Sequence, residues 1–111
     1  MDCIFCKIAN KEIPTKFVYE DDSYAAFNDI NPKAPTHILI IPKKHIESFH
    51  NIYLQQDKDL VKGLFDVAWK IIEDLEIKWC QLHINSGNDH WQEVMHVHLH
   101  LVSQNTTNIV W

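Results

Sequence analysis

The chain has 111 residues, 46% of them hydrophobic, and a formal net charge of -5. This length predicts a single domain, residues 1–111, with a core of its own. The acidic balance and the lack of a run of lysine and arginine argue against nucleic acid as a partner.

No stretch of about 18 consecutive apolar residues occurs, so we expect no membrane partner. The N-terminus does not resemble a secretion signal, and an odd count of three cysteines suits a reducing compartment. We therefore expect the protein in the cytoplasm, with the nucleus open as an additional location.

The first half of the chain predicts a hairpin followed by a central strand. Residues 16–20 and 24–28 flank the polar cluster 21–23, which is typical of a hairpin turn. Residues 31–35 contain two prolines and predict a rigid loop. Residues 36–42 are apolar on both faces, which predicts a strand in the middle of a sheet.

The second half predicts one long helix and two more strands. Between residues 55 and 75, apolar residues recur at steps of three and four, which describes one face of a helix. Gly63 falls inside that helix at a modest cost. We expect strands near 79–85 and 94–102, joined by a polar loop. The fold class is therefore α+β, an antiparallel sheet of about five strands with one long helix packed on it.

Three histidines alternate with apolar residues in the last expected strand. Because successive side chains of a strand point to opposite faces, His96, His98 and His100 would share one face. These positions span about 13 Å of strand, whereas the ligands of one zinc ion lie about 2 Å from the metal. One ion cannot bind all three. Either only some of these histidines bind a metal ion, or the three have different roles.

A Cys-x-x-Cys motif, Cys3-Ile4-Phe5-Cys6, opens the chain and is a weak signal by itself. A redox role would need a βαβ context, which is absent. A zinc site would need two more ligands, which His45 and His96 could supply across the sheet. Two incidental thiols remain the alternative. For Cys80, we expect a small buried hydrophobic side chain without a function.

The middle of the histidine row is where a nucleophile or general base would be placed. An imidazole can attack phosphorus or a carbonyl if one ring nitrogen is available and the other is held by a hydrogen bond. His98 occupies that position, with His37 and His100 as partners. Asn85 shares the polar face of residues 79–85 and would look onto the same side, whereas we interpret His83 on that face as a structural or surface residue.

Asp29 lies at the end of an expected strand, beside aromatic and branched apolar residues. It could simply form a turn, as aspartate often does. Its carboxylate could also accept hydrogen bonds from a sugar diol, with Phe27 and Ile30 sheltering a flat base in an apolar cleft.

These motifs resemble a known family. The run from His96 to Val102 is similar to the His-φ-His-φ-His-φ-φ signature of the histidine triad superfamily. Further segments match its Hint branch, the histidine triad nucleotide-binding proteins, over nearly the whole length. They are Cys3-Ile4-Phe5-Cys6-Lys7-Ile8, Glu12-Ile13-Pro14, Tyr19-Glu20-Asp21, Ala34-Pro35-Thr36-His37 and Ile41-Pro42-Lys43-Lys44-His45.

The resemblance implies a hydrolase or nucleotidyl transferase that cleaves nucleoside 5'-phosphoramidates or acyl nucleotides at the α-phosphate and releases a purine nucleoside monophosphate such as AMP or GMP. By analogy, His98 forms a covalent nucleotidyl-histidine, which water then hydrolyses. His100, His37 and Gln92 would hold the phosphate oxygens and reacting groups. No catalytic metal is then needed, because fixed donors can stabilise the phosphoryl charge.

The resemblance also implies a nucleotide pocket, a structural metal and a homodimer. Asp29 would take the ribose hydroxyls and Asn85 would help to fix the nucleotide. A structural zinc ion would be bound by two cysteines and two histidines: Cys3, Cys6, His45 and His96.

Some segments depart from the family pattern. His90-Trp91 replaces small residues before Gln92, the usual Gly-Gly-Arg is missing after Val102, and the C-terminal tail ends in Trp111. The leaving group is therefore the least transferable property. Three other functions stay open: a nucleotide-binding scaffold with residual hydrolysis, a dinucleoside polyphosphate hydrolase, and a metal-binding protein without a nucleotide role.

Overall fold

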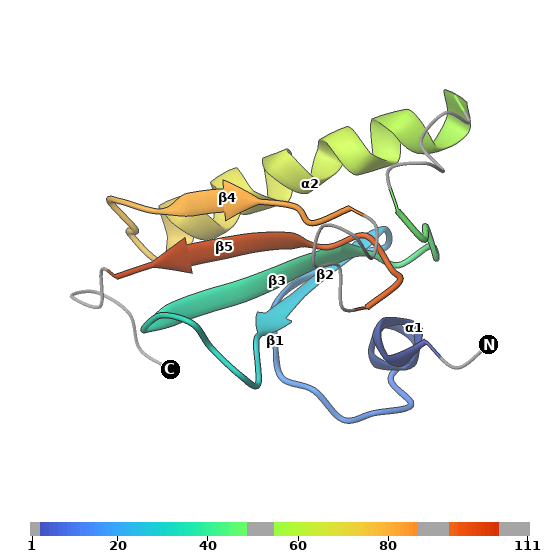
Figure 1. The fold of residues 1–111 in the computed structure, drawn as a ribbon, viewed down its shortest axis with the longest axis horizontal. Coiled ribbons are helices and arrows are strands. Elements are labelled where there is room, and N and C mark those ends of the chain that lie inside the picture. The colour runs from blue at the N-terminus through green and yellow to red at the C-terminus, as the bar shows by residue number, and fades with distance from the viewer. Residues whose placement is uncertain (1–2, 49–54, 87–93, 105–111) are drawn as a thin grey trace.

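A five-stranded antiparallel sheet forms the centre of the computed structural model, which describes residues 3–48, 55–86 and 94–104 (Figure 1). The strand order is β1-β2-β3-β5-β4. The strands are β1 (Phe17–Glu20), β2 (Tyr24–Asn28), β3 (Thr36–Pro42), β4 (Gln81–His83) and β5 (Leu99–Ser103). Together with a long helix on the sheet, this confirms the expected α+β class.

The hairpin between β1 and β2 closes where the sequence predicts it. Asp21 Oδ1 accepts hydrogen bonds from the backbone N–H groups of Ser23 and Tyr24, both at 2.8 Å. The Tyr19 hydroxyl donates to the second carboxylate oxygen of Asp21 at 2.6 Å. An aspartate that caps its own turn in this way fixes the register of the two strands.

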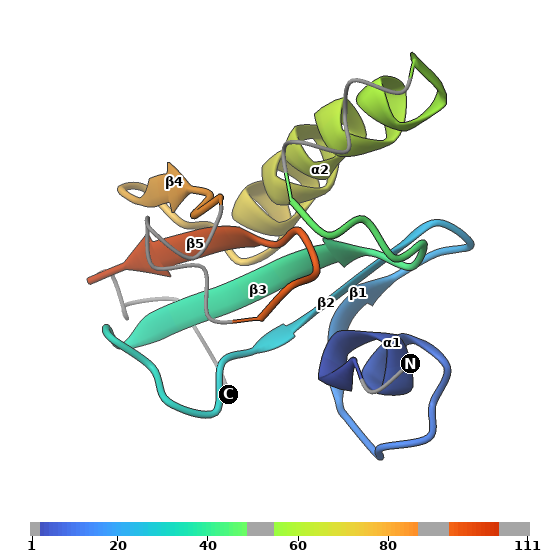
Figure 2. The ribbon, with the colours of Figure 1, turned by 45° about the vertical axis from the view of Figure 1, so that its right-hand side comes forward.

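Strand β3 is buried along its whole length, as its apolar faces predict. Ile38 and Ile40 pack on one side with the long helix α2 (Gln55–Asp74), whereas Leu39 and Ile41 pack on the other side with a short helix α1 (Ile4–Ala9). The two helices therefore cover opposite faces of the sheet (Figure 2).

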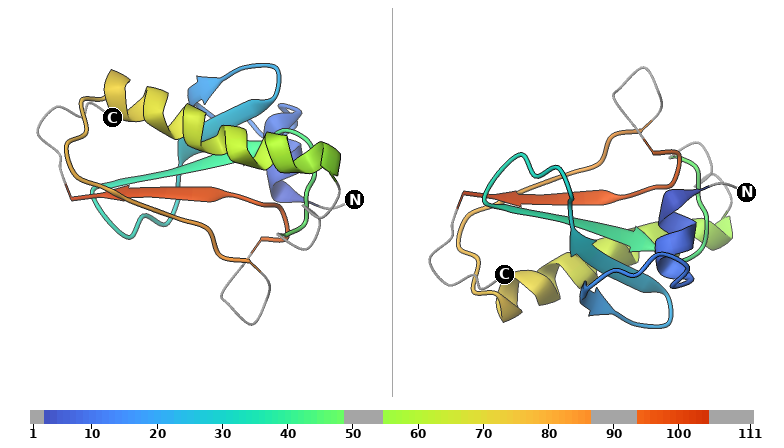
Figure 3. Two further views of the ribbon diagram at one scale, coloured as in Figure 1. Left: turned by 90° about the horizontal axis from the view of Figure 1, so that it is seen from above. Right: turned by 90° about the horizontal axis from the view of Figure 1, so that it is seen from below.

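Helix α2 lies roughly along β3 and β5 (Figure 3). Its residues Leu64, Ala68 and Ile71 are in the core. Gly63 has a specific reason to be in this helix. A Cβ atom there would lie 2.0 Å from the hydroxyl oxygen of Tyr24, which donates a hydrogen bond to the carbonyl of Leu60 at 2.6 Å. The glycine lets the tyrosine reach the helix backbone. None of the helices that the structure describes is long and apolar enough to cross a membrane.

Helix α1 is not among the elements that the sequence analysis expects. The Sγ atom of Cys3 accepts the backbone N–H of Cys6 at 3.4 Å and caps the first turn. Phe5, Ile8 and Ala9 are buried against the sheet. Six residues give too little periodicity to be recognised in a sequence, and packing rather than propensity stabilises such a helix.

The last strand is shorter than expected, since β5 begins only at Leu99. If the register of β3 with β5 continued, Val97 would lie opposite Pro42, which has no N–H to donate. Val97 instead donates its N–H to the carbonyl of Ile46 at 2.7 Å. The segment with His96 and His98 therefore leaves the ladder, although Val97 and Leu99 still enter the core on the α2 side.

Candidate active site

His98 is held in one tautomer by the backbone. Its Nδ1 lies 2.7 Å from the carbonyl oxygen of His96, and a carbonyl can only accept, so Nδ1 carries the proton. In a neutral imidazole the lone pair is then on Nε2. The residue is only 5% exposed, and its ring packs edge-on against Phe5, with ring centres 5.0 Å apart.

A chain of donors fixes the tautomers of the two partner histidines. The backbone N–H of Lys33 donates to Nδ1 of His37 at 3.0 Å, so the proton of His37 is on Nε2. That Nε2 lies 2.9 Å from Nδ1 of His100, which must accept. The remaining N–H of His100 is therefore on Nε2. The site thus contains an imidazole lone pair on His98 and a fixed donor on His100.

These partner histidines are neutral at physiological pH. Burial, and after it the neighbouring imidazoles, lower the pKa of His100 to about 4. Burial also lowers the pKa of His37, against the opposing effect of Asp29, whose Oδ2 lies 3.5 Å from its Nε2. His100 can therefore stabilise charge as a neutral hydrogen-bond donor through its Nε2–H, while His37 holds the ring of His100 in position.

These residues open onto a cavity of about 800 Å³. Of the nucleotide-binding candidates, Asp29, Asn85, His98 and His100 line it, and so does His37. The Oδ1 atom of Asp29 accepts the backbone N–H of Asn31 at 2.9 Å, which fixes the carboxylate.

Two other candidates lie elsewhere. Phe27 is buried against Phe5, with ring centres 5.6 Å apart, and is not among the residues that line the cavity. Ile30 is 89% exposed beside Asp29, so it does not shelter a cleft in this structure. Gln92, His90 and Trp91 lie outside the described residues, as does Trp111.

The four residues of the expected metal site come together. Cys3 Sγ lies 3.4 Å from His96 Nδ1, and Cys6 Sγ lies 3.3 Å from His45 Nδ1 and 3.6 Å from His96 Nδ1. The four ligand atoms all lie within 4.8 Å of one another. In a tetrahedral site with zinc bonds of about 2.0 Å to nitrogen and 2.3 Å to sulfur, these atoms are about 3.5 Å apart. The group could therefore bind a metal ion.

The protonation of this group also suits a metal. His96 Nε2 donates to the carbonyl of Pro42 at 2.7 Å, which leaves the lone pair of Nδ1 directed at the thiols. Burial lowers the pKa of His96 to about 4, so the ring is neutral. Burial and the hydrogen bond with Cys3 raise the pKa of Cys6 to about 11, so a metal has to displace its proton.

A second set, Asp29, His37 and His100, is also close enough to ligate an ion. Its tautomers oppose this role, because His37 directs an N–H toward His100 rather than a lone pair. All three residues line the cavity of about 800 Å³ next to His98.

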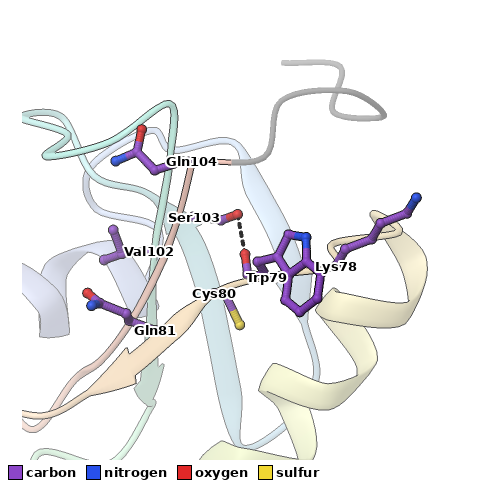
Figure 4. Close-up of a pocket in the computed structure, with 7 residues that line it drawn as sticks. All are labelled: Lys78, Trp79, Cys80, Gln81, Val102, Ser103 and Gln104. Carbon is purple, nitrogen blue, oxygen red and sulfur yellow. Dashed lines mark hydrogen bonds between the residues drawn. The ribbon is translucent and has the colours of Figure 1, made fainter.

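A neighbouring cavity of about 620 Å³ lies where β4 begins and β5 ends (Figure 4). Trp79 and Cys80 line it, and the hydroxyl of Ser103 donates to the Trp79 carbonyl at 2.5 Å. The expectation that Cys80 is buried is wrong, because its residue is exposed. It precedes the edge strand β4, on which no further strand packs among the described residues.

Comparison with known proteins agrees with this geometry. The family model described as "Scavenger mRNA decapping enzyme C-term binding" matches residues 2–110. A histidine triad protein of Clostridium difficile has the same fold, with a TM-score of 0.87, 43% identity, and coverage of 100% of this chain and 97% of that one. The chain belongs to the histidine triad (HIT) family.

Two further relatives of this HIT protein carry functional names. A HIT family hydrolase of Legionella pneumophila is 40% identical with a TM-score of 0.86, and the match covers 99% of this chain and 97% of that one. The purine nucleoside phosphoramidase of Escherichia coli is 41% identical over 103 residues, which cover 91% of this chain and 86% of that protein. This HIT protein is therefore a member of a family of nucleotide-binding hydrolases.

The structure adds residues to the HIT site that the sequence analysis did not single out. Phe5 packs edge-on against both His96 and His98, and the backbone of Lys33 orients His37. His83, which we expected to be structural or on the surface, is exposed and stacks on His100. The alternation of β4 could have indicated His83, whereas nothing local in the sequence points to Phe5 or Lys33.

Proposed function

We propose that this protein cleaves nucleoside 5'-phosphoramidates, or related acyl nucleotides, at the α-phosphate. The observation that carries the proposal is the hydrogen bond from His98 Nδ1 to the His96 carbonyl at 2.7 Å. This hydrogen bond stabilises the tautomer of His98 that has its lone pair on Nε2. In that form the imidazole can act as a nucleophile without first losing a proton.

In the first step, Nε2 of His98 attacks phosphorus and the P–N bond breaks. The amine leaves with the electron pair of that bond and takes up a proton. In the second step, water attacks phosphorus, the N–P bond to His98 breaks, and a nucleoside monophosphate is released. Splitting one displacement into two in this way is the advantage of covalent catalysis.

The other residues of the cavity would stabilise the negative charge on the phosphate oxygens and bind the nucleoside. The Nε2–H of His100 is placed to donate to a phosphate oxygen, and His37 holds that ring in position. Asp29 has a carboxylate oxygen available for the ribose hydroxyls, and Asn85 offers an amide on the same face. The role of Gln92 in holding the phosphate oxygens and reacting groups is proposed from the family resemblance alone.

The name of the Escherichia coli relative supports a phosphoramidate as substrate and a purine nucleotide as product. We propose that the nucleotide binds with its sugar at Asp29 and its phosphate at His98 and His100. The order of these residues across the sheet, with Asp29 after β2 and His100 on β5, supports that orientation.

We also propose that the group of Cys3, Cys6, His45 and His96 binds a structural zinc ion. Two thiols and two imidazoles are a usual ligand set for structural zinc, and their spacing suits a tetrahedron. The ion would connect helix α1 to the segment that precedes β5. It would thereby hold Phe5 of α1 in contact with the ring of His98.

A homodimer is the third part of the proposal. Aromatic and aliphatic side chains are exposed on helix α2, on edge strand β4 and just before that strand. They are Phe65, Trp69, Trp79 and Leu82. Exposed apolar residues of this size beside an unpaired strand edge are typical of a protein interface.

Intact-protein mass spectrometry during turnover tests the function. With adenosine 5'-phosphoramidate, we expect AMP release and a fraction of the protein that is heavier by one nucleotidyl group. The His98→Asn variant should show neither, while it still binds AMP in calorimetry. Full turnover by that variant would contradict the proposal, and AMP binding by the wild type without any turnover would favour the scaffold alternative.

A further inference from the structure

A row of polar side chains crosses four neighbouring strands. Asp29 directly follows β2, His37 is on β3, His100 is on β5, and His83 is on edge strand β4. Successive members are close together: 3.5 Å from Asp29 Oδ2 to His37 Nε2, 2.9 Å from there to His100 Nδ1, and 4.5 Å between the ring centres of His100 and His83. Asp29 and His83 are thus the two ends of one row.

The contact between His83 and His100 is well defined. The two residues are directly opposite each other in the pairing of β4 with β5, and their rings are parallel within 9°. Parallel rings at this spacing are in van der Waals contact. His83 is exposed and lines the cavity, and its ring covers one face of His100 there.

The chemistry of the cavity differs between its ends. Asp29 is the only carboxylate among the described residues that line it, and it lies together with Lys33 at the end opposite His83. Near His83 the wall contains the carboxamide of Gln81. Gln81 is on the same face of β4, two residues from His83. This end offers hydrogen-bond donors and an imidazole, which favour a negatively charged group.

The proposed function gives this end a role. If the sugar lies at Asp29 and phosphorus at His98, then the group on the other side of phosphorus is the leaving group. It would extend past His100 toward β4. We propose that His83 is a specificity-determining residue that binds an anionic group, carboxylate or phosphate, carried by the leaving group. This inference rests on the proposed function for its orientation.

A pair of substrates tests it. One is AMP joined through its phosphorus to the nitrogen of glycine, which carries a carboxylate. The other is AMP joined in the same way to glycinamide, which is neutral and has nearly the same shape. The readout is the ratio of kcat/KM for the first substrate to kcat/KM for the second. A change in the position of His100 alters both values together and leaves the ratio unchanged.

Two variants separate the polar role of His83 from its stacking. His83→Phe keeps a ring on His100 but has no nitrogen atoms, and His83→Leu removes both. We expect the wild type to prefer the carboxylate, and both variants to lose about five-fold of that preference, the effect of one partly solvated charge contact. An equal ratio in all three proteins would overturn the inference.

The result stays interpretable if the proposed function fails. In that case neither substrate is cleaved, and calorimetry with ADP and AMP replaces the kinetics, since the β-phosphate of ADP lies beyond the α-phosphate. We expect the wild type to bind ADP more tightly relative to AMP than His83→Phe does, by about the same factor. The same relative affinity in both proteins would reject the role of His83.

Discussion

His96 and His98 are two residues apart, yet the backbone prepares them for opposite tasks. His96 donates from Nε2 to the Pro42 carbonyl and directs the lone pair of Nδ1 at two thiols. His98 donates from Nδ1 to the His96 carbonyl and keeps the lone pair on Nε2. The ring nitrogen that meets a carbonyl therefore decides whether the imidazole suits a metal ion or a nucleophilic attack.

The surroundings of the two histidines differ in the same sense. His96 is fully buried beside helix α1, where Cys3 and Cys6 approach it. His98 lines the cavity together with the partner His100, whose ring centre is 4.8 Å away. A closed set of four ligands suits a structural metal, whereas an open cavity suits a substrate.

The largest effect that tests this comparison is on catalysis. We expect His98→Asn to lower kcat/KM for adenosine 5'-phosphoramidate by about a thousand-fold or more, because the nucleophile is lost. The matched variant His96→Asn should mainly lower the melting temperature and the bound zinc, with activity retained in the folded fraction. Steady-state kinetics, calorimetry and metal analysis would measure the three properties. Equal losses of activity in both variants would show that the roles are not separated.

Metal removal should be the next largest effect. A chelator is expected to lower the melting temperature of the wild type by about 5 °C or more, because the metal binds only the folded ligand set. Cys6→Ser should start from the lower value and respond little to the chelator. Because burial raises the pKa of Cys6 to about 11, zinc binding displaces a proton and its affinity should increase with pH. Identical melting curves with and without chelator would contradict the zinc proposal.

Phe5 connects the two histidines, and its truncation should affect both. Its ring centre lies 5.9 Å from that of His96 and 5.0 Å from that of His98. We expect Phe5→Leu to lower the free energy of unfolding by about 1–2 kcal/mol and to reduce both zinc affinity and kcat. Phe17→Leu on edge strand β1 is the control, since Phe17 is half-buried and its ring faces Lys11. Denaturant unfolding should separate the two variants.

The smallest effect concerns pH. Burial lowers the pKa of His100 to about 4 from an ordinary 6.5, so between these values the unfolded chain binds a proton that the folded chain does not. The stability from this residue is therefore complete above pH 6.5 and is lost as the pH falls toward 4. Urea unfolding at pH 7 and pH 5 should show a steeper loss in the wild type than in His100→Gln. A matching slope would mean that His100 is protonated equally in both states.

Local patterns in the sequence were enough for most of the sheet. The continuous apolar run at β3 and the turn at Asp21 predicted a central strand and a hairpin, and both are present. The same reasoning missed α1, because its stability comes from contacts of Phe5 and Ile8 with the distant sheet. The exposure of Cys80 was not predicted either, because Cys80 directly precedes β4, and only the sheet order decides that β4 is an edge strand.

The sequence by itself determined that Val97 and Leu99 enter the core and that His98 and His100 face the other side, since the pleat of an extended chain imposes this alternation locally. Only the tertiary structure decided how the histidines differ. Cys3 reaches His96 from 93 positions earlier in the chain, and the Lys33 backbone sets the tautomer of His37 and through it that of His100. A tautomer depends on which carbonyl, amide or thiol arrives at each ring nitrogen, and those partners meet only when the chain is folded.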